Sequence, residues 1–273
     1  MKKWILVAAV GFIMSVLAAC GGDEAGSGSG DKKEVTIGAT SGPYSDMVTK
    51  AIKPGLEEKG YTVEVKEFSD YIQPNNALAE GDLDANLFQH KIYMETFAKQ
   101  HNMDLSEVIV VPTAPMGIYS QKFHSIEDIK EGSAIAIPND PTNAARAFQI
   151  LEDAKLITLK PDTDPLTVSE KDIDENVKNL QFKPIEAAQL PRAVDSVDLS
   201  AVPGNYALAA DMDLLDALQL EDMPDQYRNR VVVNTKDVES QLAKDIKAVV
   251  EADQFEKTID NEFKGFGKPE WME

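Results

Sequence analysis

The sequence is 273 residues long and has 47 Asp and Glu residues against 27 Lys and Arg residues, which gives a formal net charge of −20 at pH 7. A body of that charge repels nucleic acids and anionic lipids, so the composition excludes binding to either through general electrostatics. Hydrophobic residues make up 43% of the chain, which excludes intrinsic disorder as its general state. The length suits two modest domains or one large domain.

The N-terminus has the pattern of a secretory signal peptide over residues 1–19. Lys2 and Lys3 precede an apolar run that ends at Ala19 and is short for a bilayer span of about 20 residues. Residues 17–20, Leu-Ala-Ala-Cys, resemble the bacterial lipobox, whose cysteine receives a diacylglyceryl group and becomes the first residue after cleavage. Cys20 is the only cysteine, so an intramolecular disulfide is excluded. The alternative is an ordinary signal peptide that contains a cysteine by chance.

Residues 20–32 are rich in Gly and Ser and predict a flexible linker that begins at the lipidated cysteine. Two acyl chains hold a protein stably at a bilayer, whereas one does so only marginally. We therefore expect a folded body tethered to the cell membrane on its extracytoplasmic face. The alternative is a disordered tail without a tethering role.

The rest of the chain alternates between strand and helix patterns. Period-two hydrophobicity and apolar runs predict strands, and apolar positions at helical spacing predict helices. The predicted strands are 35–39, 62–68, 83–88, 107–112, 117–120, 134–138, 180–185, 197–202 and 230–235. The predicted helices are 44–58, 74–80, 91–101, 141–154, part of 206–217, 238–251 and 254–263.

This alternation predicts an α/β fold with a largely parallel sheet. We expect two lobes, the first made of residues 33–115 with 229–273 and the second of residues 116–228. A cleft between two such lobes is the usual place for a small ligand.

An aromatic group is expected near the ends of the early strands. If residues 86–90 are extended, Phe88 and His90 point to the same side. Tyr71 follows a strand and Tyr93 lies one turn into the next helix, so the four rings form a box where α/β folds place ligands. The alternative is that the rings belong to the core and His90 is a hydrogen-bonded loop histidine.

A carboxylate site is expected where the strand at 134–138 runs into a helix. Asp140 suits the N-cap, and helix N-termini favour anions. Asn143 and Arg146 share one helical face, and an arginine can grip a carboxylate with two hydrogen bonds. The alternative is an exposed arginine on an ordinarily capped helix.

Two asparagines complete the polar candidates. Asn205 lies in a turn that enters a helix, and Asn229 lies just before a strand near the expected crossover between lobes. An amide offers both a donor and an acceptor, so either side chain can bind a zwitterion. Asparagine is also simply common in turns.

Signals for catalysis and for metals are absent from the sequence. It contains no GxSxG, Walker A, HExxH or GxGxxG motif, and the spacing of His90, His101 and His124 does not suggest a metal site. We therefore expect no enzymatic activity, no cofactor and no resident metal.

Several stretches together resemble the methionine-binding lipoproteins of ABC importers, the NlpA/MetQ family. They are "SDYIQPNNAL" (69–78), "DANLFQH" with Tyr93 (84–93), "PMGIYS" (115–120), "AIPNDPTNAARA" (136–147), "QLPRAVDSVDLSAVPGNYA" (189–207) and "YRNRVVV" (227–233). The sequence departs from the family at Pro203, where an Asn or a β-branched residue is common, and in "HKIY", which replaces His-x-Pro-Tyr.

The resemblance implies a two-lobed periplasmic-binding-protein fold that holds methionine between the lobes. It implies a thioether pocket made of Tyr71, Phe88, His90 and Tyr93. It implies contacts from Asn143 and Arg146 to the charged end of the ligand, with Asn205 and Asn229 completing the polar set.

We therefore expect a monomeric, lipid-anchored protein that captures methionine and delivers it to an ABC permease. One alternative is the same role for a methionine-containing dipeptide or another apolar amino acid, and the preference for L- or D-methionine stays open. Alternatives of other classes are a metal-delivery lipoprotein that uses His90 with carboxylates, a surface hydrolase and a surface adhesin.

Overall fold

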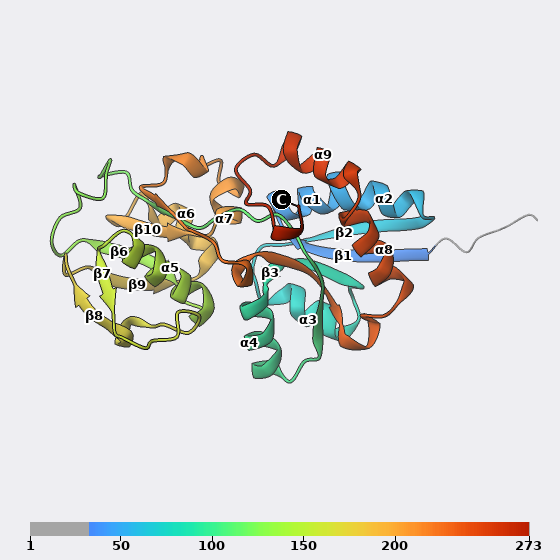
Figure 1. Ribbon diagram of the computed structural model, residues 1–273, viewed down its shortest axis with the longest axis horizontal. Helices are drawn as coiled ribbons and strands as arrows, with labels where there is room; N and C mark the ends of the chain where they lie inside the picture. The colour runs from blue at the N-terminus through green and yellow to red at the C-terminus, as the bar shows by residue number, and fades with distance from the viewer. Residues whose placement is uncertain (1–32, 273) are drawn as a thin grey trace, which may run out of the picture. The chain divides into compact units, whose positions relative to one another are not determined.

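A computed structural model describes residues 33–272 of the chain (Figure 1). The predicted signal peptide, Cys20 and the predicted linker lie outside the described residues. Most predicted elements are present within a few residues of their expected bounds, so the predicted α/β class is confirmed. In residues 33–272, no helix has both the length and the apolar character needed to cross a membrane.

The first sheet has the strand order β2-β1-β3-β12-β4. Its strands are β1 (Lys33–Thr40), β2 (Tyr61–Phe68), β3 (Ala85–His90), β4 (Leu105–Val110) and β12 (Asn229–Asn234). Strand β1 runs parallel to β2 and β3, whereas β12 is antiparallel to both β3 and β4. The segment at 229–234 therefore joins the middle of a sheet whose other strands come from residues 33–110.

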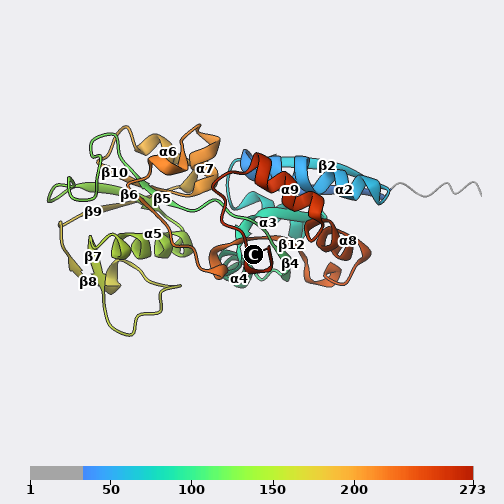
Figure 2. The same cartoon turned by 45° about the horizontal axis from the view of Figure 1, so that its top comes forward.

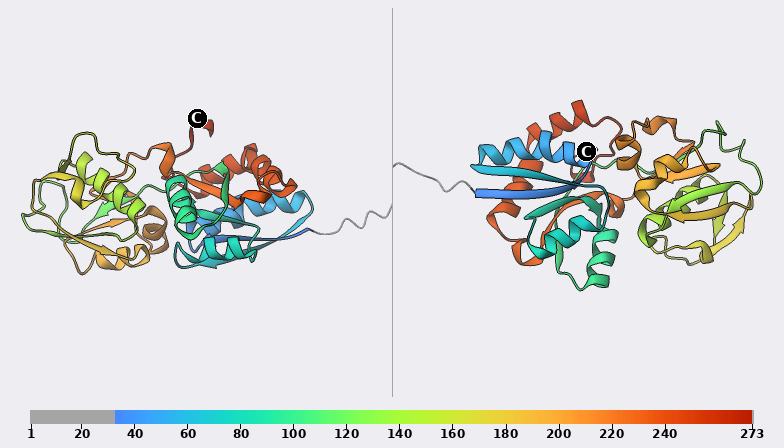
Figure 3. Two further views of the ribbon diagram at one scale, coloured as in Figure 1. Left: turned by 90° about the horizontal axis from the view of Figure 1, so that it is seen from below. Right: turned by 180° about the vertical axis from the view of Figure 1, so that it is seen from behind.

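Helices cover both faces of the first sheet. They are α1 (Pro43–Met47), α2 (Lys53–Glu58), α3 (Gln73–Glu80), α4 (Lys91–His101), α8 (Gln241–Val250) and α9 (Asp253–Glu262). Figure 1 shows α2 and α9 above the strands and α3 and α4 below them, and Figure 3 gives two further views of this arrangement. Because side chains alternate along a strand, Val231 and Val233 join the core on the side of α8 and α9, while Val232 packs with Leu78 of α3.

The second sheet has the strand order β11-β5-β10-β6-β9. Its strands are β5 (Gly117–Tyr119), β6 (Ala134–Pro138), β9 (Gln181–Ile185), β10 (Leu199–Val202) and β11 (Gln219–Leu220). Figure 2 shows α5 (Pro141–Asp153) on one face and α6 (Leu190–Ala193) with α7 (Gly204–Ala209) on the other. A separate antiparallel pair, β7 (Ile157–Leu159) with β8 (Ile173–Asn176), was not expected from the sequence.

The expectation of a largely parallel sheet is confirmed, because in each sheet four of the five strands run in one direction, and only β12 in the first sheet and β5 in the second run against them. In the second sheet β6 is parallel to β10 and β9, but β5 is antiparallel to β10 and β11. The antiparallel strands β5 and β12 each follow a segment that crosses from the other sheet. Neither strand is joined to its neighbour in the sheet by a crossover helix, which is the connection that makes neighbouring strands parallel.

Two predicted helices are interrupted. The helix expected at 44–58 contains a π-helical turn at Val48–Ile52, just before Pro54, which has no N–H to continue the α-helical ladder. The helix expected within 206–217 ends at Ala209, and Asp211 then takes a left-handed conformation with φ 57° before a 3₁₀ turn at Leu214–Asp216.

Three segments of the chain meet between the sheets. Residues 111–116 lead from β4 to β5, and residues 221–228 lead from β11 back to β12. The C-terminal segment joins them, because Thr113 and Gly267 exchange two backbone hydrogen bonds of 3.1 and 2.9 Å. The Thr113 hydroxyl also accepts a bond from the backbone N–H of Asn229 at 2.7 Å. This junction positions one wall of the site described next.

Candidate functional site

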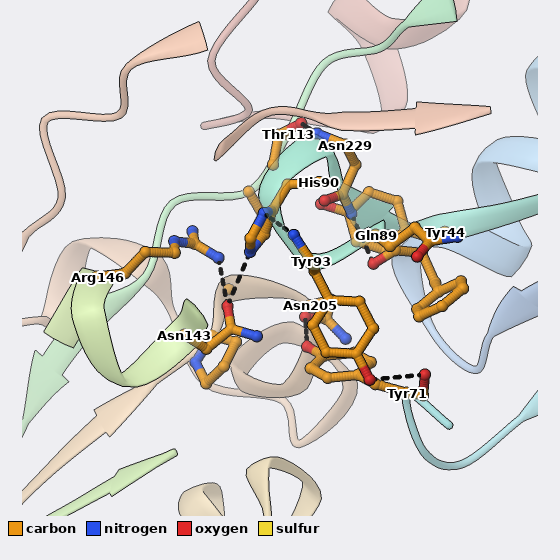
Figure 4. A pocket seen from close by; sticks show the side chains of 14 residues that line it. Tyr44, Tyr71, Gln89, His90, Tyr93, Thr113, Asn143, Arg146, Asn205 and Asn229 are labelled. Atoms are coloured by element: carbon orange, nitrogen blue, oxygen red, sulfur yellow. Dashed lines mark hydrogen bonds between the residues drawn. The ribbon is translucent and has the colours of Figure 1, made fainter. Parts of the chain in front are cut away.

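A cavity with about 320 Å³ of empty space lies where elements of the two sheets meet (Figure 4). All the ligand-binding residues expected from the sequence line it, so the structure brings them together. They are Tyr71, Phe88, His90, Tyr93, Asn143, Arg146, Asn205 and Asn229. Sequence reasoning missed the other lining residues, which include Tyr44, Gln89, Thr113 and Ala114.

Aromatic rings form one side of the cavity. Tyr71 stacks on Phe88 with 5.9 Å between ring centroids, and Tyr93 meets both rings edge-on at 5.9 and 6.0 Å. The Tyr93 hydroxyl donates to the backbone carbonyl of Tyr71 at 2.9 Å, which fixes the loop after β2 against α4. Tyr206, whose ring lies 4.9 Å from that of Tyr71, extends the cluster from α7 and was not expected there.

His90 ends β3 and caps α4, although histidine is not among the usual N-cap residues. Its Nδ1 accepts the backbone N–H of Tyr93 at 3.1 Å, so in the neutral ring the proton is on Nε2. That nitrogen lies 3.4 Å from Oδ1 of Asn143 and can donate to it. Burial, reinforced by the charge of Arg146, holds the pKa of His90 well below its usual value, so the imidazole is neutral.

The amide of Asn143 is fully engaged with protein groups. Its Nδ2 donates to both carboxylate oxygens of Asp140, the N-cap of α5, at 3.1 Å. Its Oδ1 accepts a bond of 2.9 Å from Nη1 of Arg146 and faces His90. Asn143 therefore joins α5 to the end of β3 and orients the guanidinium of Arg146.

Arg146 is 5% exposed, so the alternative of an exposed arginine is wrong. Its Nε and Nη2 bind the two carboxylate oxygens of Glu221 at 2.7 and 2.5 Å. Burial opposes the charge of Arg146, but the attraction of Glu221 prevails and raises the pKa of the guanidinium. Of the five N–H groups of an arginine, three are thus engaged, and two have no partner among residues 33–272.

Glu221 is the main functional candidate that sequence reasoning missed. It lies just after β11 in an acidic stretch with Asp222 and Asp225, where nothing local distinguishes a buried carboxylate from exposed ones. Its partner Arg146 is 75 positions away in the chain. Only the packing of α5 against the end of β11 brings the two together.

The two asparagines occupy different positions on the wall. Asn205 accepts the Tyr71 hydroxyl at 2.7 Å through Oδ1, and its buried Nδ2 has no hydrogen-bond partner within the described part of the chain. Asn229 donates from Nδ2 to the Phe88 carbonyl at 3.0 Å. A buried donor without a partner is costly, so Asn205 and the two remaining N–H groups of Arg146 suit a ligand that brings acceptors.

No group of three or more His, Cys, Asp or Glu side chains in residues 33–272 is placed to hold a metal ion. His90, the residue on which a metal-delivery role depended, has both ring nitrogens facing protein groups. The site gives no support to that alternative.

Comparison with known proteins places the chain among lipoproteins. The profile of the family described as NlpA lipoprotein matches residues 35–271. The D-methionine-binding lipoprotein MetQ of Salmonella typhi is 33% identical over 274 aligned positions, which cover 98% of this chain and 99% of the relative.

Solved structures agree with the fold. A nutrient-binding protein from Burkholderia cenocepacia bound to methionine has 37% identity and a TM-score of 0.80, over 85% of this chain and 97% of that chain. A periplasmic substrate-binding protein of an ABC transporter from Coxiella burnetii has 33% identity and a TM-score of 0.81, over 86% of this chain and 100% of that chain. The predicted periplasmic-binding-protein fold is confirmed by these likenesses.

Proposed function

The chain belongs to the NlpA lipoprotein family, and on that basis we propose that it captures methionine between two lobes and delivers it to an ABC permease. The lobes we propose are residues 33–115 with 229–273, and residues 116–228. The mechanism is closure of the lobes on the ligand, followed by recognition of the closed form by the permease. No catalytic step and no cofactor is involved.

One observation carries the proposal: unpartnered buried donors face the same cavity as a cluster of aromatic rings. The two remaining N–H groups of Arg146 and the Nδ2 of Asn205 suit the carboxylate of an amino acid. Charge-assisted bonds from a buried guanidinium to a carboxylate are the stronger kind of hydrogen bond. The ligand's carboxylate is thus expected on the side of α5 and α7.

The rings of Tyr71, Phe88 and Tyr93 then receive the side chain of the ligand. Contacts between a thioether sulfur and aromatic rings contribute roughly 0.3–1.5 kcal/mol each. A ring cluster of this kind favours methionine over a charged or polar side chain. His90 is neutral, so it places no charge next to the thioether of the ligand.

Methionine is the proposed ligand, because the cavity combines aromatic rings with buried donors for one carboxylate. A methionine-containing dipeptide or another apolar amino acid remains the second candidate of the same class.

We further propose that Cys20 carries the lipid and that the chain acts as a monomer on the extracytoplasmic face of the cell membrane. The Leu-Ala-Ala-Cys sequence at 17–20 and the kinship with named lipoproteins support the anchor. Labelling of growing cells with a radioactive fatty acid tests it. Wild type takes up the label, and Cys20→Ser does not.

Isothermal titration calorimetry of the full chain in detergent, freed of ligand by dialysis, tests methionine binding. The panel contains L-methionine, D-methionine, methionine dipeptides, leucine and norleucine. We expect saturable binding of methionine, weakened at least tenfold in Arg146→Ala, because loss of a charge-assisted pair costs at least about 1.5 kcal/mol. The matched control is Arg192→Ala, which removes an exposed arginine from α6 and leaves affinity unchanged. Absence of methionine binding by folded protein contradicts the proposal.

A further inference from the structure

The carboxylate of Glu221 forms a buried ion pair with Arg146 and does not itself line the cavity. The side chains of Arg146 and Glu221 are 6% and 4% exposed, and the pair is bidentate. Glu221 is absent from the residues that surround the cavity, whereas Arg146 is among them. Any influence of Glu221 on a ligand therefore passes through Arg146 or through its electric field.

Glu221 is held in place by residues 111–116, which lead from β4 to β5. Its backbone N–H donates to the Met116 carbonyl at 2.9 Å, and its Oε2 accepts the Met116 N–H at 3.1 Å. The strand that precedes it, β11, is paired with β5. The carboxylate thus sits on a fixed backbone, and its two oxygens hold one edge of the guanidinium of Arg146.

A second contact restrains the guanidinium from residues 221–228, which lead from β11 back to β12. The Cζ of Arg146 lies 5.3 Å from the ring centroid of Tyr227, whose hydroxyl accepts a 2.9 Å bond from Gln149 of the same helix. With Nε and Nη2 bound to Glu221 and Nη1 bound to Asn143, the guanidinium has little freedom to turn. Its two remaining N–H groups, one on Nη1 and one on Nη2, are left for a ligand.

The charges around the cavity nearly cancel. Arg146 is offset by Glu221 within the pair. Asp140 adds a negative charge at the N-terminus of α5, where the Asn143 backbone and side chain and the Thr142 hydroxyl donate to it. Arg230 forms ion pairs with Glu107 and Asp225. A buried site without surplus positive charge disfavours a ligand that carries a net negative charge.

From this geometry we propose that Glu221 is a specificity-determining residue that positions Arg146 and neutralises it, so that the cavity accepts a zwitterion and discriminates against a carboxylate that lacks the ammonium group. This inference rests on the proposed function. It adds that the choice of a free amino acid over its 2-hydroxy acid depends on a carboxylate outside the cavity. The negative charge of Glu221 attracts the ammonium group of the amino acid. The 2-hydroxy acid has no such group, so the charge of Glu221 only repels its carboxylate.

The test compares two probes, L-methionine and 2-hydroxy-4-(methylthio)butanoate, which replaces the ammonium group with a hydroxyl. Calorimetry of the full chain gives the ratio of their dissociation constants for wild type and for Glu221→Gln. Glutamine keeps the size and an acceptor for Met116 but removes the charge. In Glu221→Gln we expect the affinity for the hydroxy acid to rise at least tenfold relative to that for L-methionine, which corresponds to about 1.4 kcal/mol.

Glu221→Asp is the matched control, because it keeps the charge on a shorter side chain. Its ratio should stay within threefold of wild type even if both affinities fall. A shift below tenfold in Glu221→Gln, including a parallel loss of both ligands, overturns the inference, as does a ratio in Glu221→Asp that moves as far as in Glu221→Gln.

Folding is checked by thermal unfolding of each variant. If Glu221→Gln has no cooperative transition, Glu221→Ala takes its place with the same expected shift of at least tenfold, and a smaller shift overturns the inference. The wild-type titration distinguishes a failure of the proposed function from a failure of the role of Glu221. Wild type that does not bind methionine contradicts the proposed function, whereas wild type that binds it with a ratio unmoved by Glu221→Gln contradicts only the role of Glu221.

Discussion

The hydroxyl of Tyr71 donates a 2.7 Å hydrogen bond to Oδ1 of Asn205, and the two residues belong to different halves of the fold. Tyr71 follows β2 of the first sheet, and Asn205 lies in the first turn of α7, which covers the second sheet. The bond directs Oδ1 of the amide toward the aromatic rings. It leaves Nδ2 as the donor without a partner among the described residues.

Removal of this hydroxyl should weaken methionine binding. Tyr71→Phe leaves Oδ1 of Asn205 without its donor and lets the amide turn, so we expect an affinity about tenfold lower, given a cost of roughly 1–3 kcal/mol for an unsatisfied buried group. Calorimetry measures the effect. The control is Tyr61→Phe, because Tyr61 also donates one bond, to Asp245 at 2.8 Å, and is not among the residues around the cavity. Equal losses in both variants would refute a specific role for Tyr71.

Phe88 should determine how well the cavity distinguishes sulfur from a methylene group. In Phe88→Leu we expect the preference for methionine over norleucine to fall by up to about tenfold, because each sulfur–aromatic contact contributes roughly 0.3–1.5 kcal/mol. Competition of the two amino acids for the protein measures the ratio. Phe148→Leu is the control. It alters an aromatic pair with Phe182 in the core between α5 and the second sheet, and it should leave the ratio unchanged. An unchanged ratio in Phe88→Leu argues against a ring-lined thioether pocket.

His90 should make the ligand-free protein less stable in mild acid. Its pKa is lowered in the folded state, so between about pH 6.5 and 5 the unfolded chain binds a proton that the native chain does not. The stabilisation is present above pH 6.5 and is lost progressively as the pH falls below that value. Urea unfolding at a series of pH values measures the slope.

The matched variants for this slope are His90→Asn and His124→Asn. Asparagine can cap α4 without titrating, so His90→Asn should flatten the dependence between pH 7 and 5. His124 is exposed, and its replacement should keep the wild-type slope. A slope that persists in His90→Asn assigns the effect to another group.

Gly204 should tolerate no side chain, because α7 begins in close contact with residues 111–116. A Cβ at this position would lie 2.4 Å from the Pro115 carbonyl oxygen and 2.7 Å from Cβ of Ala114. We expect Gly204→Ala to cost about 1–3 kcal/mol, to lower the melting temperature by roughly 2–10 °C and to weaken ligand binding through Asn205. Gly60→Asn is the control, since a Cβ there meets nothing within 4 Å and asparagine tolerates its φ of 86°. Equal melting temperatures for wild type and Gly204→Ala would contradict the close approach.

Much of the fold and the lining of the cavity follow from local patterns. The helix at Lys91–His101 was predicted at its observed bounds, because its apolar spacing and its boundaries are local features. Phe88, His90 and Tyr93 were predicted as neighbours because strand and helix geometry relate residues so close in the chain. Asp140 was predicted as a cap for the same reason, and it accepts the Asn143 N–H at 2.9 Å.

Features that depend on distant partners escaped prediction. The antiparallel insertion of β12 between β3 and β4 depends on the path of the returning chain, which hydrophobic periodicity does not encode. The pairing of Arg146 with Glu221 joins a helix residue to a residue just after a strand, and the two share no motif. His90 was expected either in an aromatic box or as a hydrogen-bonded loop histidine, and its capping of α4 became visible only once its ring was placed.

Thr113 connects the C-terminal segment of the protein to the cavity wall. It bonds to Gly267 through its backbone and to Asn229 through its hydroxyl, while Trp271 donates to the Val110 carbonyl at 3.1 Å. Affinity among relatives can therefore drift through substitutions near residue 267 that never touch the ligand. A comparison restricted to cavity residues would assign the same specificity to two such relatives and would miss the substitutions that change their affinities.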